Sequence, residues 1–197
     1  PERCAGAEGH DTASIGGLVS LPPVIFATLG KGDRRALDRA LLTQLRLTHL
    51  SQKLERYALV LGDLLVRLLQ DTDARVGPLA CTAAERLGFP AATVVERIRR
   101  NQQSDLSVIG GLLSSACYID QSLPALLYLA ARYPDDIEAA LIANANAGGD
   151  NCHRGAILGA ILGAALGFEA IPERWVQRLS ACDGLQQEID TFVGRFG

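Results

Sequence analysis

The chain lacks methionine entirely and is poor in aromatic residues, which make up 5% of its 197 residues and include a single tryptophan. Because translation starts with methionine, we expect residues 1–197 to be the remainder of a longer protein whose N-terminal portion is missing. So few aromatic side chains leave little surface for stacking single-stranded bases. The 19 basic residues are outnumbered by 22 acidic ones, so we expect no nucleic-acid partner.

Closely spaced cysteines are absent as well. The five cysteines are scattered along the chain without a C-x-x-C pair, which argues against a structural zinc site. An odd number of widely separated thiols favours free cysteines in a reducing, intracellular compartment. An organelle stays open as an alternative, because a targeting signal would lie in the missing N-terminal portion.

No hydrophobic run is long enough to cross a membrane. The longest candidate lies between Arg154 and Glu169, and it is shorter than the roughly 20 residues that a transmembrane helix needs. We therefore expect no membrane span. Glycines recur every fourth residue in this run, at positions 155, 159, 163 and 167. Small residues at that period predict a central core helix against which another helix packs closely.

The alternating pattern of strands is also missing, whereas apolar residues recur at three- and four-residue spacing. This periodicity predicts an all-α, globular protein with a single domain over residues 1–197. Residues 1–32 have the composition of a loop with one short helix. The predicted helices span residues 34–47 with Asp33 as the cap, 51–69, 78–87, 90–100, 107–118, 122–132, 135–147 and 155–167, with two more from 172 and from 184. The pair at 107–118 and 122–132 is expected to be the most buried hairpin.

The polar segment between two apolar helices carries the candidate site. It reads Gly148-Gly149-Asp150-Asn151-Cys152-His153-Arg154. Paired glycines let the backbone enter positive φ, and the helix that follows offers free N–H groups to an anion. A carboxylate at such a place either caps the helix, pairs with a neighbouring group or binds a metal. His153 and Arg154 either bind a phosphate or donate to carbonyls at the nearby helix end.

The order of motifs around this segment resembles the C-terminal part of the ADP-ribosylglycohydrolase family. The matching stretches are Pro124–Tyr128, Asp136–Leu141, Ala147–Asp150, Gly155–Ala160 and Ile171–Trp175. The resemblance is clear over about residues 106–180. It is weaker over residues 10–105, where Thr48-His49 looks like the family's Thr-His element, although an isolated histidine is usually structural.

This resemblance implies a compact orthogonal helical bundle with two magnesium ions in a cleft for the ribose of an ADP-ribosyl group. In the family, the oxygen ligands that magnesium requires come from an N-terminal Thr/Ser-Asp-Asp cluster and from a Gly-Gly-Asp-Thr-Asp-Thr motif. Gly148, Gly149 and Asp150 match that motif. Asn151 stands where the family commonly has threonine, Cys152 replaces the second metal-binding aspartate, and His153 replaces the last threonine.

No Thr-Asp-Asp cluster occurs near the start of the chain, where His10-Asp11-Thr12 offers a single acid. Sulfur and imidazole are poor magnesium ligands. The metal site therefore looks eroded, and magnesium is not assured by this chain. The variant motif is similar to that of a divergent branch that includes the J1 crystallins, which are structural lens proteins.

Two functions remain open at this point. One is hydrolysis of an ADP-ribosyl glycosidic bond, if the protein is catalytically intact. The other is a non-catalytic pseudoenzyme that serves as a crystallin-like or complex-associated subunit with a protein partner. Gly148, Gly149, Asn151, His153 and Arg154 are the expected contacts of an ADP-ribose-type ligand, with Asp150 as the expected metal ligand. The sequence assigns no catalytic residue.

Overall fold

The computed structural model describes residues 10–30 and 33–197, and this part of the chain forms eleven α-helices without any strand. In chain order the elements are η1 (Ile15–Leu18), α1 (Leu21–Leu29), α2 (Arg34–Arg46), α3 (Gln52–Gln70), α4 (Val76–Arg86), α5 (Ala91–Asn101), α6 (Asp105–Ser107), η2 (Val108–Leu112), α7 (Ile119–Arg132), α8 (Ile137–Asn146), α9 (Asn151–Leu166), η3 (Phe168–Ala170), α10 (Glu173–Gln177) and α11 (Cys182–Phe196). The predicted all-α fold is confirmed.

Local capping explains where several helices begin. The Asp33 carboxylate accepts a hydrogen bond from the Arg35 N–H at 2.9 Å, at the start of α2. The Asp136 carboxylate does the same for the Ala139 N–H at the start of α8, also at 2.9 Å. Such caps satisfy N–H groups that have no partner within the helix. The predicted start of α2 is therefore confirmed, whereas α8 begins two residues later than the predicted residue 135.

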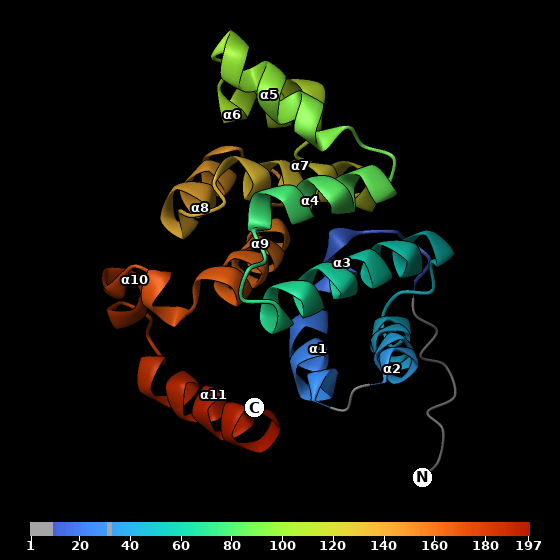
Figure 1. The fold of residues 1–197 in the computed structure, drawn as a ribbon, viewed down its shortest axis with the longest axis vertical. Coiled ribbons are helices and arrows are strands. Elements are labelled where there is room, and N and C mark those ends of the chain that lie inside the picture. The colour runs from blue at the N-terminus through green and yellow to red at the C-terminus, as the bar shows by residue number, and fades with distance from the viewer. Residues whose placement is uncertain (1–9, 31–32) are drawn as a thin grey trace.

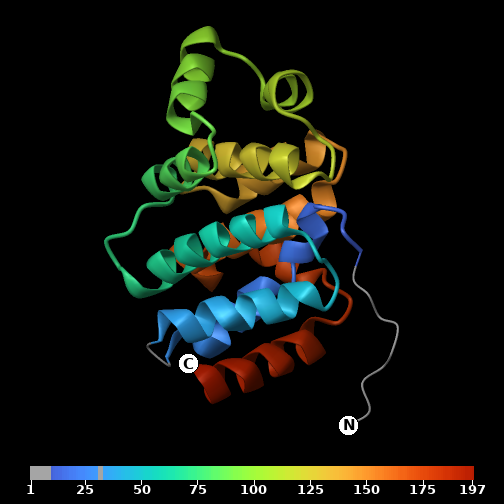
Figure 2. The ribbon, with the colours of Figure 1, turned by 90° about the vertical axis from the view of Figure 1, so that its right-hand side faces the viewer.

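The helices stack in layers, and α7 lies in an inner layer between α5 on one side and α9 on the other (Figure 1). It packs against α4, α5, α8 and α9, and nearly all of its side chains are buried. Figure 2 shows α4 and α7 stacked on α3, with α1, α2 and α11 beyond α3. The most buried helix is thus the one predicted around residues 122–132, and it carries Pro124 in its interior.

The prediction of a helix over residues 107–118, the other half of the hairpin, is wrong. Instead of a helix over residues 107–118, the chain forms the single turn α6, the π-helical turn η2 and then irregular backbone up to Tyr118. Gly110 and Gly111 weaken a helix here, because glycine loses more backbone freedom than other residues. The irregular stretch also has a structural role, since the Ser115 carbonyl accepts a hydrogen bond from the Asp150 N–H at 2.9 Å.

The glycine-rich helix α9 is a core helix, as predicted, and it contacts α3, α7, α8 and η1. The close approach expected along its glycine stripe is present only at Gly155, where a Cβ atom would lie 2.9 Å from Asn144 Nδ2. At Gly159 and Gly163 a Cβ atom would meet nothing within 4 Å in the described part of the chain, so the prediction is wrong there. Among the described helices, none has the length and apolar character of a membrane span.

Because most side chains of α7 are buried, shortening one of them should lower the stability of the protein strongly. Leu126 is fully buried, so Leu126→Ala should lower the free energy of unfolding by about 2–5 kcal/mol, measured by urea denaturation. The matched control is Leu112→Ala, because Leu112 is 55% exposed and its replacement should change stability by less than about 0.5 kcal/mol. Equal effects of the two substitutions would contradict this packing.

Candidate functional site

The paired glycines form the turn between α8 and α9. Gly148 and Gly149 have φ angles of 65° and 63°, in the left-handed region that glycine adopts without strain. At Gly149 a side chain is also excluded by contact, because a Cβ atom there would lie 2.0 Å from the Ser115 carbonyl oxygen. The backbone of the turn therefore packs directly on the irregular stretch before α7, as only glycine permits.

Arg154 anchors this turn from inside the protein. Its side chain is fully buried, and it donates to Asn144 Oδ1 at 2.6 Å, to the Asn144 carbonyl at 3.2 Å and to the Gly148 carbonyl at 2.9 Å. Burial lowers the pKa of the Arg154 guanidinium, and the nearby Asp150 carboxylate opposes that effect. The group thus binds carbonyls at the end of α8, which was the alternative to a ligand contact, and it is not presented to solvent.

Asp150 occupies the cap position of α9, but its carboxylate makes no capping bond to the helix. Instead Asp150 Oδ1 lies 2.8 Å from His153 Nδ1, one turn into the helix. The Asp150 side chain is 16% exposed and that of His153 is 53% exposed. This contact fixes the imidazole with Nδ1–H donating, so the pair presents an imidazole ring, backed by a carboxylate, to solvent.

Asn151 and Cys152, which lie between Asp150 and His153 in the sequence, form hydrogen bonds with other neighbours. Asn151 is half-buried, its carbonyl accepts from Asn144 Nδ2 at 2.8 Å, and its own side-chain amide donates to the Ala145 carbonyl at 3.4 Å. The exposed Cys152 thiol donates to Asn151 Oδ1 at 3.4 Å. Of the residues predicted for the site, Asp150 and His153 are therefore the two whose side chains the structure brings into direct contact.

A second imidazole lies at the same place and was not assigned to the site from the sequence. His49 is 7% exposed, and its Nε2 lies 3.1 Å from Ser14 Oγ while its Nδ1 lies 2.8 Å from Thr48 Oγ1. Burial, and the positive charge that His10 can carry nearby, lower the pKa of His49. The rings of His10 and His49 meet edge to face, with their centroids 4.1 Å apart.

The 3₁₀ turn η1 joins the two imidazole groups. A Cβ atom at Gly17 would lie 2.9 Å from His49 Nδ1, and one at Gly16 would lie 3.5 Å from His153 Cε1. All three histidines of the chain therefore gather around this turn. The Thr48-His49 element was the only signal in the sequence, because positions 10, 49 and 153 are brought together by tertiary packing alone.

The donors at this turn do not fit a pair of magnesium ions. Asp150 is the one carboxylate of the 148–154 segment, and its Oδ1 is engaged by His153. Over residues 10–30 and 33–197, no group of three or more histidine, cysteine, aspartate or glutamate side chains is arranged to hold a metal ion. Magnesium takes a near-octahedral set of oxygen ligands, which a carboxylate beside a thiol and an imidazole does not supply.

Comparison with known proteins agrees with the fold. The family model described as ADP-ribosylglycohydrolase matches residues 1–197. The chain belongs to the ADP-ribosylglycohydrolase family. The match extends over the whole chain, well beyond residues 106–180, where the resemblance is clear from the sequence.

A solved structure described as "ADP-ribosylglycohydrolase-related protein complex" has a fold similar to that of this chain. Its TM-score is 0.63 at 24% sequence identity, over 96% of this chain and 63% of the other. The chain thus spans less than two thirds of that relative's length. A search of curated proteins returned no match.

The two glycines of the turn allow a matched experiment. Gly149→Ala should lower the free energy of unfolding much more than Gly148→Ala, because both add strain at positive φ but only alanine at 149 collides with the Ser115 backbone. Gly148→Ala should cost about 1–2 kcal/mol, measured by urea denaturation. Equal costs would show that Ser115 yields freely and does not hold the turn.

The buried His49 predicts a pH dependence of stability. Because its pKa is lowered in the folded protein, the unfolded chain takes up the proton more readily. Stability should therefore be full above the ordinary histidine pKa of about 6.5 and should fall as the pH drops below it. Urea midpoints at about pH 7.5 and about pH 5.5 should differ less for His49→Gln than for the wild type. An unchanged difference would exclude His49 as the source.

Proposed function

We propose that the protein hydrolyses the glycosidic bond of an ADP-ribosyl group, with His153 as the proton-transfer group. The observation that carries this proposal is the contact between Asp150 and His153 at the N-terminus of α9, on the glycine turn of an ADP-ribosylglycohydrolase-family chain. A carboxylate that accepts the hydrogen bond of Nδ1 holds the imidazole ring in one orientation, with Nε2 as the opposite nitrogen. His153 is therefore suited to protonate a leaving atom.

In this reaction the imidazolium donates its Nε2 proton to the nitrogen or oxygen that leaves the anomeric carbon. The bond between that atom and the carbon breaks, and water attacks the carbon. The proton that the water loses restores the imidazolium. Asp150 keeps its hydrogen bond to Nδ1 throughout, so its role is to hold and stabilise His153. Gly148, Gly149 and Asn151 are the proposed contacts of the bound ligand around the same turn.

Magnesium is given no step in this reaction. Asp150 alone does not provide the oxygen ligands that the ion requires, and Cys152 is a poor substitute for a second carboxylate. Asp150 is therefore proposed as a partner of His153 rather than as half of a two-metal site. A magnesium site in a longer form of the protein would need its remaining oxygen ligands from other residues.

A second function is a non-catalytic scaffold, as in the crystallin-like branch that the motif resembles. The observation that favours it is the replacement of the family's acidic and hydroxyl ligands at Cys152 and His153. In this case the glycine turn and the buried Arg154 are retained for the stability of the fold. The protein then acts as a structural or complex-associated subunit, and a protein partner covers part of its surface.

The two functions are distinguished by release of ADP-ribose from an ADP-ribosylated protein. Under the hydrolase proposal, Asp150→Asn and His153→Gln should each lower the rate by about 10²–10⁴. The matched control is Asp190→Asn, which alters an exposed aspartate bound to Gln186 and should leave the rate unchanged.

The hydrolase and the scaffold predict different rates of ADP-ribose release. No turnover by a stably folded wild-type protein would favour the scaffold, and unchanged turnover in the Asp150 and His153 variants would exclude the proposed roles. Calorimetric titration with magnesium is the complementary measurement. Tight binding of two ions by residues 1–197 would contradict the ligand count on which the proton-transfer role of His153 rests.

A further inference from the structure

A serine and a histidine meet at the start of η1, separately from the contact between Asp150 and His153. Ser14 Oγ lies 3.1 Å from His49 Nε2. Ser14 occupies the cap position of η1, yet its hydroxyl makes no capping bond to that turn. The hydroxyl is therefore engaged by an imidazole instead of by the helix, as in a nucleophile that lies beside its base.

The second contact of His49 decides which of its nitrogens carries the hydrogen. Its Nδ1 lies 2.8 Å from Thr48 Oγ1, and Thr48 Oγ1 donates its single hydrogen to the Leu45 carbonyl at 3.4 Å. The Thr48 oxygen is thus the acceptor of this contact, so Nδ1 carries the hydrogen and Nε2 is the unprotonated nitrogen. Nε2 therefore accepts the hydrogen bond of the Ser14 hydroxyl. A third group that orients the base in this way is common to serine and cysteine nucleophiles.

The surroundings shield the base more than the serine. His49 is 7% exposed, whereas Ser14 and Gly16 are half-buried, so the start of η1 is partly open to solvent. Burial is the main reason why the pKa of His49 is lowered, and the charge that His10 can carry acts in the same direction. A lowered pKa favours the unprotonated imidazole, which is the form that a general base requires.

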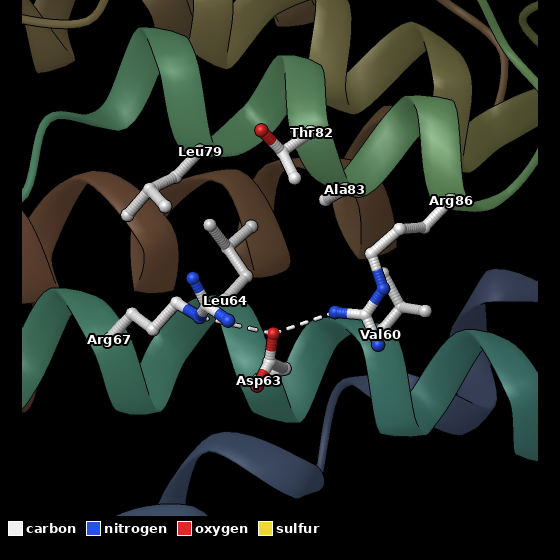
Figure 3. A pocket seen from close by; sticks show the side chains of 8 residues that line it. All are labelled: Val60, Asp63, Leu64, Arg67, Leu79, Thr82, Ala83 and Arg86. Carbon is white, nitrogen blue, oxygen red and sulfur yellow. Dashed lines mark hydrogen bonds and ion pairs between the residues drawn. The ribbon is translucent and has the colours of Figure 1, made fainter.

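The hollow between α3 and α4 shows how polar groups are engaged elsewhere in the fold. Asp63 Oδ2 lies there between two arginines, 2.6 Å from Arg86 Nη1 and 3.2 Å from Arg67 Nε (Figure 3). The hydroxyl that lines the hollow belongs to Thr82, and it donates to the Pro78 carbonyl at 3.0 Å. No histidine is among the residues that line this hollow, so its hydroxyl has no base.

We propose that Ser14 is a nucleophile toward carboxylic esters, with His49 as its base and Thr48 as the residue that orients His49. Ser14 Oγ attacks the carbonyl carbon while His49 Nε2 takes the hydroxyl proton. The bond between that carbon and the alcohol oxygen breaks, and His49 gives the proton to the leaving alcohol. Water then attacks the acyl carbon and passes a proton to Nε2, and the serine oxygen leaves with that proton as the carboxylic acid is released.

Covalent labelling with a fluorophosphonate tests the nucleophile directly. The serine oxygen displaces fluoride from phosphorus, and mass spectrometry of proteolytic peptides identifies the modified residue. We expect the label on Ser14, at a rate that His49→Gln lowers by about 10²–10⁴ and that Ser14→Ala abolishes. The matched control is Ser20→Ala, because Ser20 is an exposed serine that accepts from Gln44 Nε2 at 3.3 Å, and its loss should leave the rate unchanged.

Substitutions of Thr48 distinguish an oriented base from a histidine that is merely buried. Thr48→Val removes the acceptor of Nδ1 and should slow labelling about tenfold, as expected for the loss of one hydrogen bond. Thr48→Ser keeps that oxygen and should retain the wild-type rate. The wild-type rate should rise with pH, with a midpoint below the ordinary histidine pKa of about 6.5, because burial and His10 both lower the pKa of His49.

Hydrolysis of p-nitrophenyl acetate measures the complete reaction. Release of p-nitrophenolate that continues beyond one equivalent, and that is lost in Ser14→Ala, supports the proposal. One burst without further release would overturn the hydrolytic step. No label on Ser14 in the folded wild type would overturn the proposal without recourse to any variant, and so would equal labelling of Ser14 in His49→Gln. Neither measurement uses ADP-ribose, so the result is independent of the proposed ADP-ribosyl hydrolysis.

Discussion

A buried arginine holds together the part of the molecule on which the candidate site depends. The Arg154 guanidinium has no contact with solvent and is bound by carbonyl oxygens of the α8 end and by the Asn144 amide oxygen. A buried charge is tolerated only when its donors are satisfied. The end of α8, the glycine turn and the start of α9 are therefore obliged to keep one relative arrangement.

That arrangement determines which chemistry reaches the surface. Arg154 points into the protein, and the preceding residue of α9, His153, is exposed at the surface. The Asp150 carboxylate contacts Nδ1 of His153. The backbone of the turn packs against Ser115 at Gly149. The irregular segment that contains Ser115, which is distant in sequence, therefore supports the turn. The turn therefore presents an imidazole and a carboxylate, where the family resemblance implies oxygen ligands for magnesium.

The two imidazoles around η1 have contrasting surroundings. His49 is buried between hydroxyl groups, and burial lowers its pKa, whereas the exposed His153 contacts a carboxylate. The contact between Asp150 and His153 is the one on which the proposed proton transfer rests. The buried His49 also has a structural use, since its ring packs against Gly17 of η1. The proposed hydrolase and the scaffold differ in which of these uses has been retained.

The sequence by itself determined the features that depend on neighbouring residues: the helical class, the start of α2 after Asp33, and the left-handed turn at the paired glycines. Caps and turns satisfy backbone groups within a few residues, so they are readable from local pattern. Only the tertiary structure decided that Arg154 faces inward, that residues 113–118 are irregular, and that His49 and His153 lie against neighbouring glycines of η1. These features depend on contacts between segments that are far apart in the sequence, and the local spacing of residues does not predict such contacts.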